Sequence, residues 1–419
     1  MKKKILSIIL LGCLILSLVA CGGNTALTNN EDTQVVETET KQEEVEFAYD
    51  VSDFITRGKV INENLYYDMK EGKISIHNMS DGSVLCEAEW DYIKLYLCDG
   101  CFALGKNIGE NQRYYALFDK DFNKIFETDE SMSGLFLQSY SEGVLVLRSL
   151  TKNASEGYDA YYYDGKNDFK LMFDTTSILA LEKSGSFYDG KAVVQSWAYN
   201  DNHETPIYLD SDGTTVYGPS NWVAFPYSIT KDGYINGISY NFPKDEYQGL
   251  AVYNVKTNEM YELPKEVVST DVYTTEGAVS LTVVGDGYMT VNTDDDNSVA
   301  IYNIKTGYLT EEKYGYVSLT QYGKNKYILV SNAKETEWTY LDENFEEVGT
   351  WYTDATDFYN GYALVLEEGA CYYYFVNENF EKVSDGILGD GAYLDLNNNV
   401  FCVMTMEEHE GYRFFTIKE

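Results

Sequence analysis

Cys98 and Cys101 have the spacing that best matches a chemical site, because Cys-x-x-Cys pairs serve redox proteins and zinc sites. A zinc site needs four ligands, and no second pair with this spacing exists. Asp99-Gly100 favours a two-residue turn, which would put the cysteines on facing strands rather than at a helix start. We expect no redox or metal function here; a disulfide across the turn stays open.

The three histidines, His77, His203 and His409, are scattered along the chain. His203-Glu204 and His409-Glu410 begin like the His-Glu-x-x-His motif of zinc proteases. Neither has a second histidine four positions on, so no metal ligand is assigned. We expect all three histidines to be structural or surface residues.

The acidic segment Asp294–Ser298 has carboxylates that could hold Ca²⁺, but it lacks the spacing of a calcium-binding loop. We expect a solvated loop, with Ca²⁺ binding left open, and we interpret Asp210–Gly213 as a hairpin turn. The sequence has no Gly-x-Ser-x-Gly, Walker A or dinucleotide motif. Paired carboxylates for glycoside hydrolysis stay open because 68 Asp and Glu residues make close pairs common. We assign no catalytic residue and no cofactor.

The N-terminus has the pattern of a secretory signal peptide. Lys2–Lys4 precede an apolar run over residues 5–20, which is short for a membrane-spanning helix. The run ends in Leu18-Val19-Ala20-Cys21-Gly22, which resembles the lipobox of bacterial lipoproteins. That resemblance implies cleavage before Cys21 and lipid attachment to Cys21. Two acyl chains would hold a folded domain stably on a membrane.

Residues 22–46 are rich in Gly, Asn, Thr, Gln and Glu and cannot bury much apolar surface. We therefore expect a signal peptide at 1–20, a lipidated cysteine with a disordered acidic tether at 21–46, and a folded domain at 47–419. The lipid would place this domain on the extracytoplasmic face of the cell membrane.

The net charge is −37, and it becomes −40 without residues 1–20, which contain three lysines and no acid. Such a surface repels phosphate backbones, so we expect no nucleic-acid partner. Attraction to cations or basic proteins stays open, although the charge can serve solubility alone. Five cysteines besides Cys21 remain in the mature chain, too few for a disulfide-dense scaffold.

A short motif recurs along the domain: an apolar stretch, then Asn, Asp or Thr, then a polar turn and a second apolar stretch. The anchors are Asn78, Asp119, Asp164, Asp210, Asn254, Asn303, Asp342, Asn377 and Thr416. Their mean spacing is about 42 residues, in the range of a four-stranded propeller blade. Each anchor therefore predicts the tip of a β-hairpin.

A second turn repeats in register with the first. Its copies are Asp99-Gly100, Glu142-Gly143, Asp189-Gly190, Asp232-Gly233, Asp286-Gly287 and Asn360-Gly361, with degenerate copies at Lys324-Asn325 and Asn397-Asn398. Each unit is thus predicted to be a four-stranded antiparallel meander. We predict an all-β, propeller-like ring of about eight blades, within a range of seven to nine, with the two chain ends sharing one blade.

The link between the second and third strands of each unit varies in length, as at 107–113, 151–157, 200–204, 241–247 and 293–298. These loops should share one rim, where binding residues usually lie. The chain has 39 Tyr, 19 Phe and 5 Trp. Most should be core, but a subset at the rim could stack on sugar rings or peptides.

Residues 354–365, from Asp354 to Val365, look like the start of a bacterial WG repeat, and residues 374–383 resemble the hairpin that ends one. Residues 187–194 and 140–146 echo the same opening. The resemblance implies a β-repeat binding or scaffolding module, often in surface proteins, with no shared catalytic residues.

We therefore expect a non-enzymatic binding, sensing or scaffolding module whose ligand is a protein or a glycan. The alternatives are an extracellular carbohydrate-active hydrolase or lyase, and a structural partner in an envelope complex. An enzyme should show convergent carboxylates with perturbed pKa values. A binding module should show an apolar or aromatic rim patch.

Overall fold

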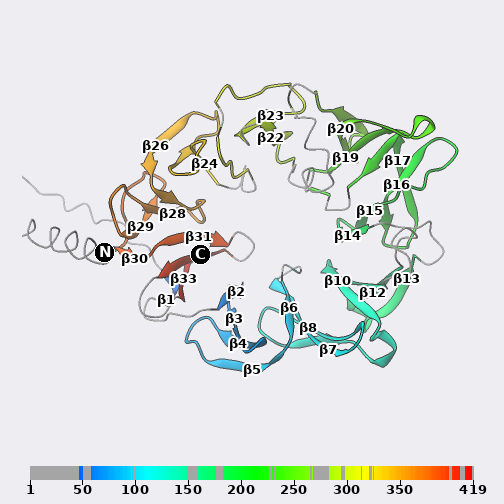
Figure 1. Ribbon diagram of the computed structural model, residues 1–419, viewed down its shortest axis with the longest axis horizontal. Coiled ribbons are helices and arrows are strands. Elements are labelled where there is room, and N and C mark those ends of the chain that lie inside the picture. Colours follow the sequence, from blue (N-terminus) through cyan, green and yellow to red (C-terminus); the bar gives the residue numbers. More distant parts are fainter. Residues whose placement is uncertain are drawn as a thin grey trace, which may run out of the picture. The chain divides into compact units, whose positions relative to one another are not determined.

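The described residues form antiparallel β-sheets almost throughout. This computed structural model describes residues 47–50, 58–95, 97, 100–149, 159–175, 183–225, 229–230, 232–264, 267, 283–293, 298–312, 314–319, 323, 325–395, 399–405 and 411–417. All of them belong to a unit that spans residues 43–419. The named strands group into nine sheets, most of them four-stranded, which confirms the predicted all-β, propeller-like fold (Figure 1).

We number the sheets in chain order. Sheet 1 contains β2 (Lys59–Asn62), β3 (Leu65–Lys70), β4 (Lys73–Asn78) and β5 (Val84–Trp90); sheet 2 contains β6 (Tyr92–Lys94), β7 (Phe102–Gly109), β8 (Gln112–Phe118) and β9 (Lys124–Glu127). Sheet 3 contains β10 (Leu135–Ser141), β11 (Val144–Ser149), β12 (Ala160–Asp164) and β13 (Lys170–Asp174); sheet 4 contains β14 (Lys183–Tyr188), β15 (Lys191–Gln195), β16 (Glu204–Asp210) and β17 (Thr215–Ser220). Sheet 5 contains β18 (Trp222–Ala224), β19 (Tyr234–Asn241), β20 (Glu246–Asn254) and β21 (Glu259–Glu262); sheet 6 contains β22 (Tyr288–Thr293) and β23 (Ser298–Asn303). Sheet 7 contains β24 (Ile328–Ser331), β25 (Trp338–Leu341) and β26 (Glu347–Tyr352); sheet 8 contains β27 (Asp354–Ala355), β28 (Tyr362–Leu366), β29 (Tyr372–Asn377) and β30 (Ile387–Leu388). Sheet 9 contains β31 (Gly391–Asp395), β32 (Val400–Thr405), β33 (Gly411–Ile417) and β1 (Phe47–Asp50). The described residues also form the short 3₁₀ helices η3 (Glu130–Met132), η5 (Gly165–Asn167) and η6 (Phe242–Lys244).

Sheets 6 and 7 continue beyond their named strands. Val299 and Tyr314 exchange two backbone hydrogen bonds of 2.7 and 2.8 Å, so the segment ending at Tyr314 lies beside β23. The Ser318 N–H donates to the Leu329 carbonyl at 2.9 Å, so residues around Ser318 lie beside β24. These segments occupy the positions of a fourth strand in sheet 6 and a first strand in sheet 7.

The tight turns between the first and second strands have the predicted geometry. Glu142-Gly143 has φ values of 53° and 81°, Asp189-Gly190 has 51° and 70°, and Asn360-Gly361 has 49° and 83°. Positive φ at both central residues is what a two-residue hairpin turn needs, which explains the recurring Gly. Gly100 also has a positive φ, 69°, but Cys98 and Asp99 lie outside the described residues.

The meander gives each sheet two different ends. Turns between strands one and two and between strands three and four share one end, which we call the turn rim. Loops between strands two and three share the other end, the loop rim, with the links to the next sheet. A bond of 2.7 Å from Gly165 N to Gly143 O joins two turns, and one of 2.7 Å from Asn221 N to His203 O joins a link to a loop.

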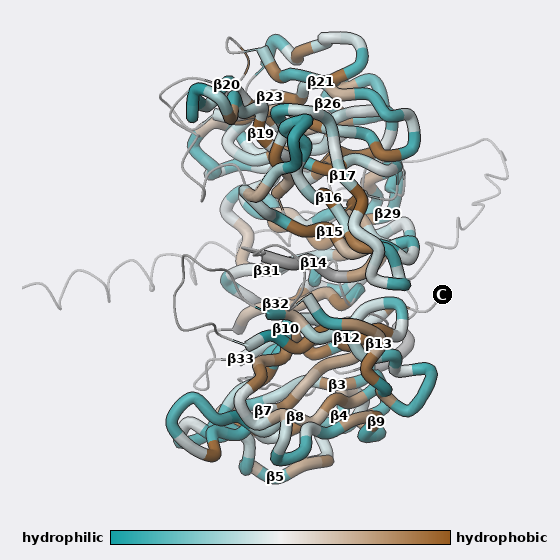
Figure 2. Tube along the Cα trace, turned by 90° about the vertical axis from the view of Figure 1, so that its right-hand side faces the viewer, coloured by the Kyte–Doolittle hydropathy of each residue, from teal (hydrophilic) through white to brown (hydrophobic). Residues whose placement is uncertain are grey.

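Burial along each strand follows its place in the sheet. The four residues Val144–Leu147 of β11 and all four residues of β24 are buried, because neighbouring sheets cover both faces of an inner strand. The outermost strands β9 and β21 are mostly exposed. Figure 2 shows the same contrast, with hydrophobic segments along inner strands and hydrophilic ones at turns.

The core consists of nine clusters of buried apolar residues, each formed between two successive sheets among the described residues. One cluster joins the last sheet to the first: Val400, Cys402 and Phe414 pack with Val60 and Tyr66. The contacts between sheets therefore run through all nine and return to the first.

The described strands make nine sheets, one more than the predicted number of about eight and within the predicted range of seven to nine. Each of the nine anchors belongs to a separate sheet. The sharing of a sheet by the two chain ends is confirmed, because β1 pairs antiparallel with β33, with Phe47 opposite Ile417. Sheet 1 nevertheless has its own four strands. The ninth sheet was hard to separate in the sequence because β2 has only four residues and the following turn, Glu63-Asn64, lacks glycine.

Candidate ligand-binding site

The recurring Asn and Asp anchors serve the hairpin turns. Asp119 Oδ1 accepts from the N–H groups of Asp121 and Asn123 at 3.0 and 2.8 Å. Asp342 Oδ1 accepts from two N–H groups of its own turn, and these bonds hold the pKa of Asp342 below its usual value. Such side chains take the place of backbone acceptors in a turn. Many of the acidic residues that recur along the repeats therefore have a structural role.

The residues singled out from the sequence lie apart. Cys21, Cys98, Asp294–Asn297 and His409 lie outside the described residues. Cys101 is 8% exposed and packs in the cluster between sheets 2 and 3.

His77 stacks on Tyr66, with centroids 4.8 Å apart, and forms a 2.9 Å hydrogen bond with Ser75 Oγ. It is a structural residue of sheet 1. Asp210–Gly213 forms the predicted hairpin turn, with Gly213 N donating to Asp210 O at 2.8 Å.

Five aromatic side chains gather on the loop rim of sheets 4 and 5: Trp197, Tyr199, His203, Tyr240 and Phe242. We call them the aromatic rim patch. Tyr199 lies 4.3 Å from Phe242 and 5.3 Å from His203, ring centre to ring centre, with interplanar angles of 31° and 23°. Trp197 meets Tyr240 edge-on at 5.3 Å. Tyr199 is 46% exposed, which is uncommon for a tyrosine with two ring neighbours.

Backbone bonds bring the two loops of the patch together. Asn221, in the link between sheets 4 and 5, donates from its N–H to His203 O and accepts at its carbonyl from Tyr240 N, both at 2.7 Å. Asn221 and His203 have positive φ values of 61° and 60°, which this close path requires. The Asn200 side chain fixes the first loop by accepting from Glu204 N at 3.1 Å.

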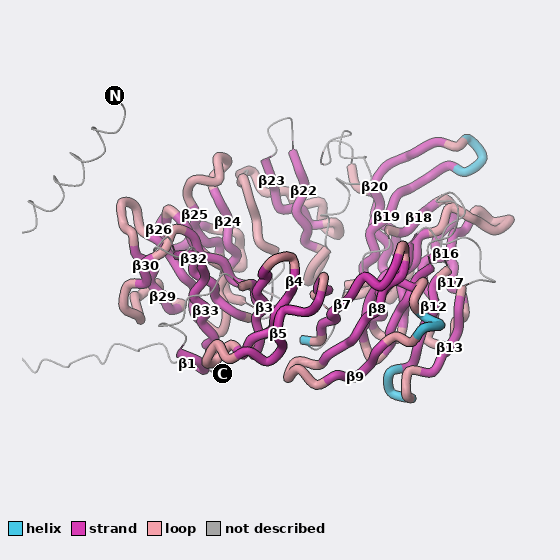
Figure 3. The backbone as a smooth tube through the Cα atoms, turned by 60° about the horizontal axis from the view of Figure 1, so that its bottom comes forward, coloured by secondary structure: helices cyan, strands magenta, loops and turns pink. Residues whose placement is uncertain are grey.

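The second loop is a 3₁₀ turn at the tip of a long hairpin. Asn241 caps η6 by accepting from Lys244 N at 3.3 Å, and Asp245 ends the helix with a φ of 53°. Figure 3 shows the β19–β20 hairpin, tipped by this helix, extending beyond neighbouring strands. The patch is therefore presented on defined turns at the rim.

Polar groups surround the aromatic faces. Asp245 accepts a hydrogen bond from the Tyr240 hydroxyl, and this bond is the main cause that raises the pKa of Tyr240. Glu204 accepts from Asn200 Nδ2 at 2.9 Å. The border also carries the exposed side chains Asp201, Glu246 and Lys244. Stacking surfaces next to hydrogen-bonding groups are typical of sites for polar organic ligands.

Two described carboxyl groups have raised pKa values: Asp354 lies on β27, the first strand of sheet 8, and Asp357 follows that strand. Burial raises the pKa of Asp354, and it raises that of Asp357 to about 6. Asp354 accepts from the Tyr373 hydroxyl at 2.5 Å and from Ala392 N at 3.2 Å, toward sheet 9. Asp357 interacts with Ser318 of sheet 7 instead. The two carboxyls therefore interact with different neighbouring sheets and do not converge as a catalytic pair.

Two observations concern metals and membranes. No group of three or more His, Cys, Asp or Glu among the described residues could hold a metal ion. No helix in the described part of the chain is long and apolar enough to cross a membrane.

The sequence predicted the loops of the aromatic rim patch and a subset of aromatic residues at the rim, but not which residues form the patch. Residues 200–204 and 241–247 were expected on one rim, and Asn221 joins them there. His203, expected to be structural or at the surface, lies in the patch. Trp197 and Tyr240 carry no sequence signal that separates them from core aromatics. The missed residue Asp357 lies inside the WG-like segment, but spacing does not reveal its burial.

Comparisons with known proteins add little. No family model and no curated protein matches the chain. Dihydro-heme d1 dehydrogenase NirN in complex with DHE is similar over 83% of this chain and 79% of that chain, with 13% identity and a TM-score of 0.43. AztD from Citrobacter koseri covers 78% of this chain and 94% of its own, with 10% identity and a TM-score of 0.39. A eukaryotic initiation factor covers 87% of both chains, with 10% identity and a TM-score of 0.39. Similarity at this level carries no argument about function.

Proposed function

We propose that this protein is a lipid-anchored, non-enzymatic binding module of the extracytoplasmic face, and that its aromatic rim patch binds a glycan. The regular scaffold supplies rigidity, and the loops of sheets 4 and 5 supply the ligand surface. Cys21 supplies the anchor.

The observation that carries the glycan proposal is the exposure of Tyr199 beside Phe242 and His203. Exposed ring faces offer flat apolar surface to the C–H face of a sugar ring. Asn200 and Glu204 lie in the same loop as Tyr199 and His203, and Asp245 accepts a hydrogen bond from the Tyr240 hydroxyl, so we expect these groups to bind sugar hydroxyls. These groups form one polar, aromatic border, which fits a neutral oligosaccharide better than a polyanion.

The alternative of a hydrolase receives no support from the raised-pKa carboxyls. Asp354 and Asp357 face different sheets, whereas glycoside hydrolysis needs two carboxyls on either side of one bond. The proposal is therefore binding without turnover.

Titration of the mature protein with chito- and cello-oligosaccharides, followed by tryptophan fluorescence and calorimetry, tests the glycan proposal. We expect saturable binding that Tyr199→Ala and Phe242→Ala each weaken at least about tenfold. Tyr217→Ala is the matched control, because Tyr217 is 39% exposed on β17 of the same sheet. Unchanged affinity in both patch variants, or no binding by any of these sugars, contradicts the proposal.

The anchor is tested separately. We expect Cys21→Ala to shift the protein from the membrane fraction to the soluble fraction, and mass spectrometry of the mature N-terminus to show a diacylglycerol on Cys21. A Cys21→Ala variant that stays in the membrane fraction to the same extent rules out this anchor without affecting the glycan proposal.

A further inference from the structure

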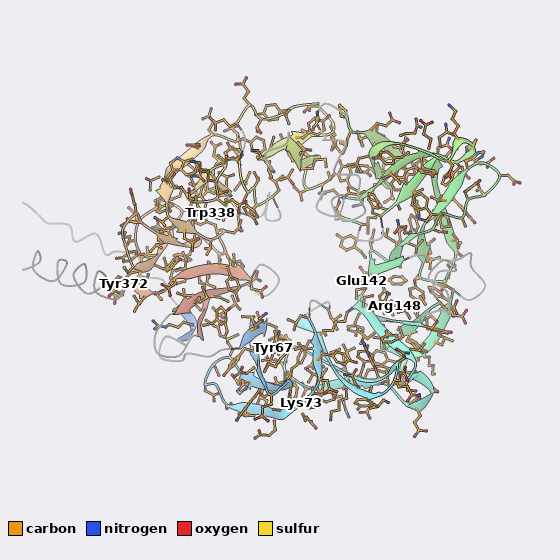
Figure 4. The ribbon with its side chains drawn as sticks, in the orientation of Figure 1. Tyr67, Lys73, Glu142, Arg148, Trp338 and Tyr372 are labelled. Atoms are coloured by element: carbon orange, nitrogen blue, oxygen red, sulfur yellow. The ribbon has the colours of Figure 1, made fainter. Side chains whose placement is uncertain are left out.

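The inner strands of sheets 7 and 8 hold a second group of side chains, separate from the aromatic rim patch. Asp357 is 8% exposed and Ser318 is 3% exposed. Tyr316, two residues before Ser318, is 42% exposed although it lies on an inner strand position. Its ring meets that of Trp338 edge-on at 5.6 Å and 61°, which holds the Tyr316 ring in place. Figure 4 shows Trp338 on sheet 7.

Asp357 has no cationic partner among the described residues. The salt bridges of the described part of the chain do not include it. The negative charge of Asp357 contributes to the raised pKa values of Tyr316 and Tyr340, both from sheet 7. Tyr340 is committed to the Thr356 carbonyl, to which it donates at 2.8 Å. A carboxyl group buried without a cation is costly, so it is retained only where something offsets that cost.

Ser318 supplies an independent observation. Its buried hydroxyl has no hydrogen-bond partner of good geometry among the described residues, although it lies near enough to Asp357 and Tyr316 to lower both pKa values. A buried polar atom without a partner usually marks the place of a water molecule or a ligand group.

We propose that Tyr316, Ser318 and Asp357 bind a primary alkylammonium group, such as the side-chain amine of lysine or one end of a diamine. A primary ammonium has three N–H donors, which suit the carboxylate and the serine oxygen. Its positive charge also interacts favourably with the aromatic ring of Tyr316. A quaternary ammonium has no N–H to donate. A divalent metal would need more oxygen ligands than this group offers.

The chain's net charge of −37 adds to this preference, because an acidic surface raises the local concentration of small cations. Ligand and proton compete for Asp357. The ammonium group binds the ionised carboxylate, so affinity is highest above the Asp357 pKa and falls below it.

Calorimetric titration of the mature protein with n-butylamine tests this site, with n-butanol as the uncharged isostere and tetramethylammonium as the cation without N–H groups. We expect n-butylamine to bind at pH 7.5 more tightly than both. Below about pH 6 its affinity should fall about tenfold per pH unit. Asp357→Asn should weaken binding at least about tenfold and remove this pH dependence, and Tyr316→Ala should also weaken it.

Asp385→Asn is the matched control, because Asp385 is an exposed carboxylate of the same repeat and should leave affinity unchanged. Equal binding of n-butylamine to the wild type and to Asp357→Asn overturns the proposal. Equal binding of n-butanol or tetramethylammonium, or no n-butylamine binding at all, overturns it as well. Circular dichroism checks that each variant is folded.

Discussion

The turn rim and the two candidate sites use polar side chains in opposite ways. On the turn rim, Glu142 of sheet 3 accepts from the N–H groups of Asp189 and Gly190 of sheet 4, at 2.6 and 2.9 Å (Figure 4). Asn62 of sheet 1 likewise donates to two carbonyls of sheet 2. At the candidate sites, Asp357 is buried without a cation and Tyr199 is exposed.

This difference separates stability from function. Side chains of the turn rim satisfy backbone groups of the next sheet and hold the repeats together. Those of the candidate sites leave a charge uncompensated or an apolar ring in water, and sites of this kind are commonly retained for binding. Substitutions should therefore lower stability at the turn rim and lower ligand affinity at the sites.

Asn62→Ala should give the largest effect. Asn62 is 3% exposed, and its amide donates to Gly100 O at 3.0 Å and to Lys120 O at 3.3 Å. Removing it leaves two carbonyls of sheet 2 without this donor, which should lower the free energy of unfolding by about 2–3 kcal/mol. Urea denaturation measures the loss. A change below about 0.5 kcal/mol would show that the turn rim does not couple these sheets.

Asp357→Asn should change stability in the opposite direction. The folded-state pKa of Asp357 is raised from 3.8 to about 6, so the folded state holds the proton more tightly than the unfolded chain. Stability is therefore lost as pH rises from about 4 to about 6. At pH 7.5 the free energy of unfolding of Asp357→Asn should exceed that of the wild type by about 1–2 kcal/mol. The gain is limited because the buried amide is itself a polar group that costs free energy to bury. Thermal melts at pH 4 and 7.5 measure this, and a variant less stable at pH 7.5 contradicts it.

Tyr199→Ala with Phe242→Ala should lower the free energy of unfolding by less than about 2 kcal/mol, because Tyr199 is largely exposed and Phe242 is a half-buried ring that packs against the apolar cluster between sheets 5 and 6. Binding of the oligosaccharides should nevertheless be lost. Denaturation and titration of the same sample measure both quantities. If the free energy of unfolding fell by more than about 3 kcal/mol, the aromatic rim patch would have a structural role instead.

Cys98→Ser with Cys101→Val should have the smallest effect. Cys101 is buried, and valine keeps an apolar side chain of similar size there, so the cost should stay near 0.5 kcal/mol. A disulfide across so short a turn would constrain little chain entropy. Differential scanning calorimetry and zinc analysis test this. A Tm lowered by more than about 10 °C in the variant, or one tightly bound zinc per chain in the wild type, would contradict the expectation that Cys98 and Cys101 have no redox or metal function.

The repeat pattern was visible in the sequence because it depends on local chemistry. Positive φ at Glu142-Gly143 and side-chain capping at Asp119 are set by neighbours within a few positions, and both were predicted. The sheet count was least certain where these turn signals are weak. Glu63-Asn64 closes the first hairpin without glycine, so the four residues of β2 gave no clear signal.

The sites were harder to predict because they depend on contacts between repeats. Tyr199 and Phe242 are 43 positions apart and meet only because Asn221 bonds to both of their loops. Nothing local to Asp357 reveals that Ser318 faces it from the preceding sheet. Spacing rules describe one strand or turn at a time, and burial between sheets lies beyond them.

The pairing of β1 with β33 decides where mechanical tension enters the fold. β1 lies at the edge of sheet 9, so among the described strands only β33 holds it. A pull on the chain that precedes β1 loads this short pair first, because no second neighbour shares the force. Tension on that chain segment would therefore act on the few backbone hydrogen bonds between β1 and β33 before it acts on the strand pairs inside the other sheets.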